Sequence, residues 1–314
     1  MKNNWKILFL GTPAFAIPSL EMLLAEGYEV TAVVTQPDRP SGRGHKLVAP
    51  PVKQCAEAHC LPVYQYEKFS REGWEDLKRW APDLMITAAF GQILSTRVLS
   101  VPRFGCINVH ASLLPKYRGA APIQWAVVNG DRVTGVTTML LNEGMDTGDI
   151  LEVAETEIGA NETAGELFER LSRLGAQLIV STVDKLGKGE LAPIKQNECE
   201  ATAAPIITKE TALMDFSLPA ERICCAVRGF SPWPVAYTLL SGRRLKVYAA
   251  LPCAFSGAAN AENGEVVCAD GRLIVRCEGG FVELTDVQLE GSRRMPAADM
   301  LKGRAVKKGD ILGR

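Results

Sequence analysis

The chain has 314 residues, of which 47% are hydrophobic, and its formal net charge is −1. Such a chain exceeds the usual size of a single domain, so we expect one large and one smaller domain. The composition excludes a membrane protein and a disulfide framework, because no apolar run could span a bilayer and the nine cysteines lack Cys-x-x-Cys spacing. We therefore expect a cytoplasmic protein with reduced thiols and no membrane association.

The first predicted elements are a strand at residues 6–10, a helix at 13–26 and a strand at 29–35. This order indicates a βαβ unit, and hence a parallel sheet with a right-handed crossover. The turn after the first strand contains only Gly11, so it lacks the Gly-x-Gly-x-x-Gly pattern of dinucleotide-binding folds. We predict a Rossmann-like domain that does not bind such a cofactor.

Residues 36–53 are rich in proline and glycine, and we predict a long exposed loop without regular structure. The segment holds four basic residues, Arg43 among them, and one acidic residue, so its local charge is about +3, as expected of a phosphate-binding segment. The alternative is a solvated connection. Long loops inside α/β domains are uncommon unless they are functional, which favours phosphate binding.

After this loop the alternation of helices and strands continues to residue 189. We expect helices at 52–59, 71–80, 122–129 and 163–188, strands at 62–64, 83–88, 133–141 and 150–155, and a strand that ends in Asn108 and His110. In open parallel sheets, ligands bind at the carboxyl ends of the strands. Asn108 and His110 are therefore predicted to lie at the ligand-binding edge.

The remainder of the chain has a different pattern. Residues 190–206 are irregular and are predicted to be a linker. They precede a helix at 219–227 and five short alternating runs at 236–240, 245–250, 264–268, 273–276 and 281–288. The predicted fold is thus α/β, with a Rossmann-like parallel-sheet domain at 1–189 and a small C-terminal β-barrel (OB-like) at 207–314.

Three polar side chains form the candidate catalytic centre. Asn108 and His110 lie two residues apart on one strand, so their side chains project from the same face. Asp146 lies in the polar turn 142–149 and can supply a carboxylate to the same place. An amide can donate to an oxygen that becomes negative, an imidazole can transfer a proton, and a carboxylate can orient the imidazole and favour its charged form. These roles fit acyl or formyl transfer without a covalent intermediate, although His110 taken alone would fit a structural role.

Two other chemistries are disfavoured. Ser112 is not expected to be a nucleophile, because it lacks the Gly-x-Ser-x-Gly context. Metal catalysis is disfavoured because the histidines at 45, 59 and 110 show no His-x-x-x-His spacing. We expect no metal ligand in the chain.

The run from Asn108 to Gly119, N-x-H-x-S-L-L-P-x-Y-R-G, followed by Asp146-Thr147-Gly148, resembles the signature of the folate-dependent formyltransferases. The resemblance covers essentially the whole length. It includes residues 9–13, the basic loop at 37–44 and residues 230–234. The central signature is common to these enzymes, whereas the basic loop points to the members that act on tRNA.

The resemblance implies a reaction and its substrates. The donor would be 10-formyltetrahydrofolate, and the acceptor would be the amino group of methionine on initiator methionyl-tRNA. Asn108 and His110 would stabilise the oxyanion, and Asp146 would assist proton removal through His110 or a bound water. No metal would be needed.

The resemblance also assigns the binding segments. Ser112, Leu113, Leu114 and Pro115 match the segment that contacts the folate, and Arg43 belongs to the loop that enters the tRNA acceptor stem. The C-terminal barrel would support the rest of the tRNA. The family also implies a monomer.

Two alternatives remain open at this point. The same catalytic set would serve another amine, such as an amino sugar nucleotide or glycinamide ribonucleotide, although those enzymes would not need the Arg43 loop. A non-enzymatic nucleic-acid-binding module is disfavoured because the chain has neither the dinucleotide turn nor a Walker Gly-x-x-x-x-Gly-Lys motif. Formyl transfer to each acceptor would discriminate among these functions.

Overall fold

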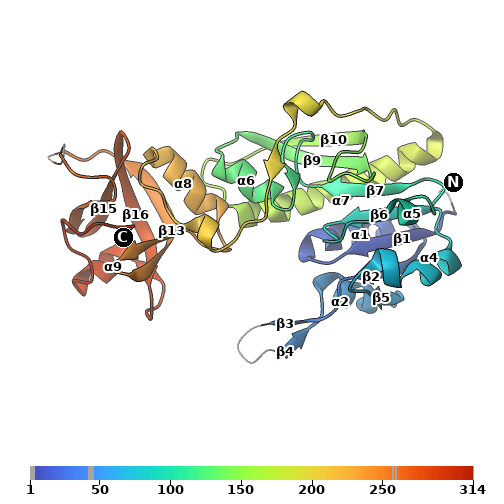
Figure 1. Cartoon of the computed structure of the whole chain (residues 1–314), viewed down its shortest axis with the longest axis horizontal. Coiled ribbons are helices and arrows are strands. Elements are labelled where there is room, and N and C mark those ends of the chain that lie inside the picture. Colours follow the sequence, from blue (N-terminus) through green and yellow to red (C-terminus); the bar gives the residue numbers. More distant parts are fainter. Residues whose placement is uncertain (1–3, 42–45, 257, 259, 314) are drawn as a thin grey trace. The chain divides into compact units, whose positions relative to one another are not determined.

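The computed structural model describes residues 4–41, 46–256, 258 and 260–313 (Figure 1). The chain forms two compact units, each assembled from three segments. The first unit comprises Met1–Gly119, Val133–Glu157 and Phe168–Ala204, and the second comprises Ala120–Arg132, Ile158–Leu167 and Pro205–Arg314. The predicted domains are continuous stretches of sequence, whereas the two units are defined by which residues pack together. Residues 120–132 and 158–167, predicted to belong to the first domain, therefore lie with the second unit.

A seven-stranded sheet forms the centre of the first unit, in the order β10-β9-β7-β6-β1-β2-β5. Its strands are β1 (Ile7–Gly11), β2 (Val30–Thr35), β5 (Val63–Gln65), β6 (Leu84–Ala88), β7 (Cys106–His110), β9 (Val133–Leu140) and β10 (Ile150–Glu157). The five strands from β5 to β7 are parallel, as predicted. β9 is antiparallel to both β7 and β10. A parallel β9–β10 pair would need a crossover of about a dozen residues or more, and the turn between them is shorter.

The predicted helices of this unit are present, two of them with breaks, and α5 was not predicted. The helical elements are η1 (Ala14–Ala16), α1 (Ile17–Ala25), α2 (Pro51–Ala58), α3 (Phe69–Glu72), α4 (Trp74–Trp80), α5 (Thr96–Leu99) and α7 (Ala164–Lys188), of which the first residues of α7 are assigned to the second unit. The helix predicted at 13–26 begins as the 3₁₀ turn η1, and Pro18 then occupies the first turn of α1, where no amide hydrogen is needed. The helix predicted at 71–80 is interrupted at Gly73, where any side chain would strike the ring of Phe69. Strands β1 and β6 are buried along their whole length, as expected of a sheet covered on both faces.

The prediction that residues 36–53 lack regular structure was wrong. β3 (Arg39–Ser41) and β4 (Lys46–Val48) pair antiparallel, with Pro40 opposite Leu47. Pro40 is tolerated because this two-stranded ribbon has no central strand. Figure 1 shows the ribbon extending away from the main sheet. Residues 42–45, which include Arg43, lie outside the described part of the chain.

An antiparallel sheet forms the centre of the second unit, in the order β12-β13-β16-β15-β14, with β17 on β16. The strands are β12 (Tyr237–Leu240), β13 (Arg243–Cys253), β14 (Val266–Asp270), β15 (Arg272–Cys277), β16 (Gly280–Leu289) and β17 (Met295–Pro296), and the helices are α6 (Pro122–Val128), η3 (Glu210–Ala212), α8 (Ala220–Gly229) and α9 (Ala297–Lys302). The last residues connect the two edges of the sheet. Leu312 donates its backbone N–H to Gly264 beside β14, and Gly313 donates to Leu239 of β12.

These contacts close the sheet toward a barrel, and the predicted fold class, α/β with a C-terminal barrel, is confirmed. All nine cysteines lie in the described part of the chain, and none forms a disulfide. Within the described ranges, no helix has the length and apolar character needed to cross a membrane.

Candidate active site

Asn108 is the middle residue of β7, and its side-chain amide is held in one orientation. Thr87 pairs with Asn108 across β6 and β7, and the Thr87 hydroxyl donates a hydrogen bond of 2.8 Å to Asn108 Oδ1. Thr87 is buried, whereas Asn108 is partly exposed. The Asn108 Nδ2 group makes no hydrogen bond to any described residue. An amide donor is therefore presented at the sheet edge, free to bind an oxygen.

His110 is the last residue of β7, and only 6% of its surface is exposed. Its Nε2 lies 2.9 Å from the backbone oxygen of Tyr117. Because a carbonyl oxygen only accepts hydrogen bonds, Nε2 carries the donated proton, and the neutral ring has its lone pair on Nδ1. Nδ1 lies 3.7 Å from Asp146 Oδ1, too far for a good hydrogen bond but near enough to attract a charge on the ring. We expected Asp146 to orient the imidazole, but the Tyr117 carbonyl is its hydrogen-bond partner.

Asp146 reaches His110 through a turn that folds back. β9 pairs Leu140 with Ile107, so the turn after β9 begins at the far end of β7 from His110. The turn returns past Leu140, and Gly148 is required there because any side chain would strike the Leu140 carbonyl. Asp146 has a left-handed backbone, with φ of +52°, and its Oδ2 accepts the Gly119 N–H at 2.9 Å. The turn therefore places the carboxylate beside the imidazole, as the sequence predicted.

Arg118, Gln196 and Glu198 hold this turn in place, and we refer to them as the clamp. Gln196 Nε2 donates to the backbone oxygens of Asp146 and Gly148, at 2.8 and 2.7 Å. Gln196 Oε1 accepts from Arg118, which also makes two hydrogen bonds of 2.8 Å to the Glu198 carboxylate. Arg118 holds the pKa of the Glu198 carboxyl below its ordinary value. Two members of the clamp, Gln196 and Glu198, come from the segment predicted to be a linker.

That segment is attached to the first unit at several points. It contains η2 (Glu198–Glu200), and β11 (Ala203–Ala204) pairs in parallel with β8 (Arg118–Gly119). The Thr202 hydroxyl also accepts the Tyr117 N–H at 2.8 Å. Residues 202–204 thereby hold the backbone that carries the Tyr117 carbonyl.

The segment predicted to contact folate follows directly after β7. Ser112 is fully buried, and its hydroxyl donates to the Lys116 backbone oxygen at 2.6 Å. This hydroxyl closes a turn. Leu114 is buried, and its N–H donates to Thr137 Oγ1 at 3.2 Å, whereas Leu113 and Pro115 are only partly buried. Leu113 and Pro115 are thus the side chains in this segment that can contact a ligand.

The basic segment carries less free charge than its sequence suggests. Arg39 pairs with Glu67 at 2.6 Å, and Lys53 pairs with Asp38 at 3.0 Å. The Asp38 pKa is lowered by hydrogen bonds from Gln65 and Lys53. Two of the four counted cations, Arg39 and Lys53, are therefore already paired with carboxylates.

Comparisons with known proteins agree with this architecture. Residues 5–183 match the family model described as formyl transferase, and residues 206–305 match the formyl transferase C-terminal domain. The methionyl-tRNA formyltransferase of Acidobacterium capsulatum is 49% identical over 311 residues, covering 98% of this chain and 99% of the relative. That of Citrifermentans bemidjiense is 46% identical over 314 residues, covering 99% of this chain and 98% of the relative.

Solved structures share the fold at much lower identity. An N-formyltransferase from Helicobacter canadensis, in complex with folinic acid and dTDP-3-aminofucose, has a TM-score of 0.65 at 19% identity, covering 89% of this chain and 98% of that one. HypX from Aquifex aeolicus, in complex with tetrahydrofolic acid, has a TM-score of 0.63 at 17% identity, covering 97% of this chain and 48% of that one. Because both family models match and relatives with one shared name are nearly half identical along the whole chain, this chain belongs to the methionyl-tRNA formyltransferases of the formyl transferase family.

Proposed function

We propose that this chain transfers a formyl group from 10-formyltetrahydrofolate to the amino group of methionine on initiator methionyl-tRNA. The names of its full-length relatives support this assignment. The structural observation that carries it is the Asn108 amide, which Thr87 fixes by its oxygen so that the N–H donor remains free. A fixed donor beside a histidine and a carboxylate fits the addition of an amine to a carbonyl group.

In the proposed reaction the amine nitrogen attacks the formyl carbon, and the carbonyl oxygen becomes negative. Asn108 Nδ2 donates a hydrogen bond to that oxygen. A donor held in place before the reaction does not have to reorganise as the charge develops, which is why it stabilises the transition state more than the ground state.

The attacking amine must lose a proton, and the folate nitrogen must gain one when its bond to the formyl carbon breaks. His110 Nδ1 can accept the proton directly or through a bound water, because Nε2 is already engaged with the Tyr117 carbonyl. The Asp146 carboxylate, 3.7 Å from Nδ1, stabilises the positive ring that results. Proton transfer in this scheme uses His110 and Asp146, with or without a bound water, and no metal.

We assign folate contacts to Ser112, Leu113, Leu114 and Pro115. Ser112 and Leu114 shape the backbone of this segment, and the partly buried Leu113 and Pro115 offer apolar surface. Arg43 in the basic loop and the C-terminal barrel are assigned to the tRNA. The proposal also includes a monomer that acts in the cytoplasm without membrane association.

One assay discriminates this function from its alternatives. The purified chain is supplied with 10-formyltetrahydrofolate and, in parallel, with initiator methionyl-tRNA, an amino sugar nucleotide or glycinamide ribonucleotide. We expect rapid formylation of the methionyl-tRNA and negligible product from the other two acceptors. If the amino sugar nucleotide were formylated in preference, the assigned acceptor would be wrong but the assigned formyl transfer would stand. If no acceptor were formylated, both the acceptor and the reaction would be wrong.

A further inference from the structure

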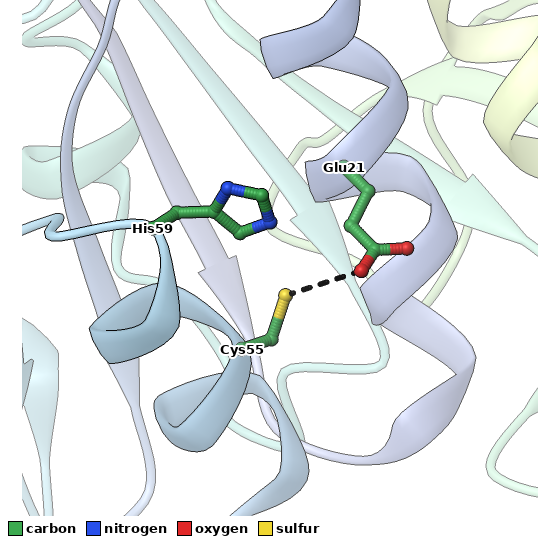
Figure 2. Close-up of side chains that lie close together, drawn as sticks. All are labelled: Glu21, Cys55 and His59. Atoms are coloured by element: carbon green, nitrogen blue, oxygen red, sulfur yellow. Dashed lines mark hydrogen bonds between the residues drawn. The ribbon is translucent and has the colours of Figure 1, made fainter.

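Three side chains of metal-binding type converge on the surface of the first unit, on elements that carry none of the catalytic residues. Glu21 lies on α1, and Cys55 and His59 lie on α2 and at its C-terminal cap. One ligand atom from each residue lies within 4.8 Å of the others. Figure 2 shows the carboxylate, the thiol and the imidazole directed toward one another between the two helices.

The helical spacing explains why these residues meet. Cys55 and His59 are four positions apart, so both side chains project from the same face of α2. That face packs against α1, on which Glu21 is one turn from Ile17 at the helix start. The sequence lacks His-x-x-x-His and Cys-x-x-Cys spacing, but Cys55-x-x-x-His59 has the same helical geometry as His-x-x-x-His.

These three side chains make few other hydrogen bonds or ion pairs with the described residues. The Cys55 thiol donates a long hydrogen bond of 3.9 Å to Glu21 Oε1, drawn as a dashed line in Figure 2. Among the described residues, the Glu21 carboxylate makes no ion pair and the His59 imidazole makes no hydrogen bond. Burial, followed by the charge of Glu21, raises the pKa of the Cys55 thiol to about 11, so without a cation the thiol keeps its proton.

We propose that Glu21, Cys55 and His59 bind a divalent cation of the zinc type, with solvent as the fourth ligand. Thiolate, imidazole and carboxylate together are the donor set of Zn²⁺, and hard cations such as Mg²⁺ prefer oxygen ligands. Zinc bond lengths place the sulfur, nitrogen and oxygen ligands of a tetrahedral site about 3.3 to 3.7 Å apart. The sulfur-to-oxygen distance of 3.9 Å is slightly longer than this range, and the exposed Glu21 and His59 side chains can rotate to bring the ligand atoms together.

Binding would release the Cys55 proton to the buffer and join α1 to α2 through the cation. The cation would then stabilise the folded chain by mass action, because the unfolded chain does not hold the three ligands together. This site is independent of the proposed function, since formyl transfer involves none of its residues. The expectation that no residue ligates a metal is revised only for this surface site.

The test is a titration of the full chain with Co²⁺, after dialysis against a chelator and in the presence of a non-thiol reductant. We expect saturation at one ion per chain, with a thiolate-to-cobalt charge-transfer band, and displacement of that band by Zn²⁺. Cys55→Ser should abolish the band. Glu21→Gln and His59→Gln should weaken binding by at least the roughly 10- to 100-fold typical of losing a supporting group at a metal site.

Cys60→Ser is the matched control, because Cys60 is an exposed thiol next to His59 that is not part of the trio. It should leave the band and the affinity unchanged. Circular dichroism of each variant verifies folding, and the exposed positions Glu21 and His59 keep the test informative if Cys55→Ser is unstable. The proposal fails if the wild-type chain shows no charge-transfer band, or if the band survives Cys55→Ser.

Discussion

The Thr87 hydroxyl donates a 2.8 Å hydrogen bond to Asn108 Oδ1 across the parallel strands β6 and β7. This bond decides which end of the Asn108 amide faces the proposed substrate. If the amide were turned over, one Nδ2 hydrogen would be used by Thr87, and Oδ1, which only accepts, would stand where the amide donor now is. The orientation of the amide therefore depends on a side chain that is itself buried and has no direct part in the reaction.

Thr87→Val removes this hydroxyl with little change in volume. We expect kcat to fall by about 2- to 10-fold, the value of one net hydrogen bond, because the amide is no longer held in one orientation. The affinity for folate should not change. Thr87→Ser keeps the hydroxyl and should restore kcat, and steady-state kinetics of the two variants measures the difference. An equal loss of kcat in both variants would indicate a packing effect.

Asn108→Ala removes the proposed oxyanion donor itself. Loss of one such donor typically costs ~2.7 to 4 kcal/mol, so turnover should fall by roughly two to three decades. Folate binding, measured by fluorescence titration, should be retained. In the Asn108→Ala background, Thr87→Val should have no further effect on kcat, since the two residues act as one unit. Near-normal turnover of Asn108→Ala would refute the assignment.

Gln196→Ala removes the donor to the carbonyls of Asp146 and Gly148. The turn should become less ordered, so Asp146 should be held less firmly beside His110. We expect kcat to fall by roughly tenfold, which corresponds to about 1.4 kcal/mol of activation free energy. Lys195→Ala is the matched control on the neighbouring exposed position and should have no effect. Hydrogen exchange of residues 142–149 should rise in Gln196→Ala alone. Unchanged exchange and rate in that variant would mean that the clamp does not position Asp146.

The sequence predicted some of this site because the relevant signals are local. The two-residue spacing of Asn108 and His110 follows from strand periodicity, which a single segment reveals. Thr87 and Gln196 could not be found in this way. Thr87 is 21 residues from Asn108, and Gln196 is 50 residues from Asp146, so each partnership depends on how distant segments pack together.

The approach of Asp146 to the site also depends on how distant segments pack. The sequence placed Asp146 in a turn after a strand, but it did not reveal that this strand, β9, runs antiparallel to β7 and that the turn folds back. The residues met as predicted, but strand direction is set by long-range pairing that hydrophobic patterns do not encode. The β3–β4 ribbon was missed because each strand has three residues and one contains a proline, which removes the alternation that reveals a strand.

The Arg118–Glu198 pair predicts a pH dependence of stability. The folded-state pKa of Glu198 is lowered by Arg118, so its contribution is fully present above the ordinary carboxyl value of 4.5 and is lost as the pH falls through the lowered value. Glu198→Gln should therefore lower the unfolding temperature at neutral pH. The difference from wild type should shrink in acid. Glu200→Gln, on the same 3₁₀ helix, is the control and should show no such convergence; a pH-independent difference for Glu198→Gln would contradict this role.

Charge reversal in the basic loop tests how the acceptor is selected. Arg43 is proposed to contact the tRNA, so Arg43→Glu should raise the KM for methionyl-tRNA, and its effect should weaken at high salt because phosphate contacts are screened. Folate affinity and kcat at saturating tRNA should stay close to wild type, because Asn108 and His110 lie on β7 and Asp146 lies in the turn after β9. Arg39→Gln is the matched control in the same loop. The Arg39 charge is already paired with Glu67 at 2.6 Å, so its loss should affect tRNA affinity much less. Equal losses of tRNA and folate binding in Arg43→Glu would point to misfolding, and an unchanged KM would remove the loop from tRNA recognition.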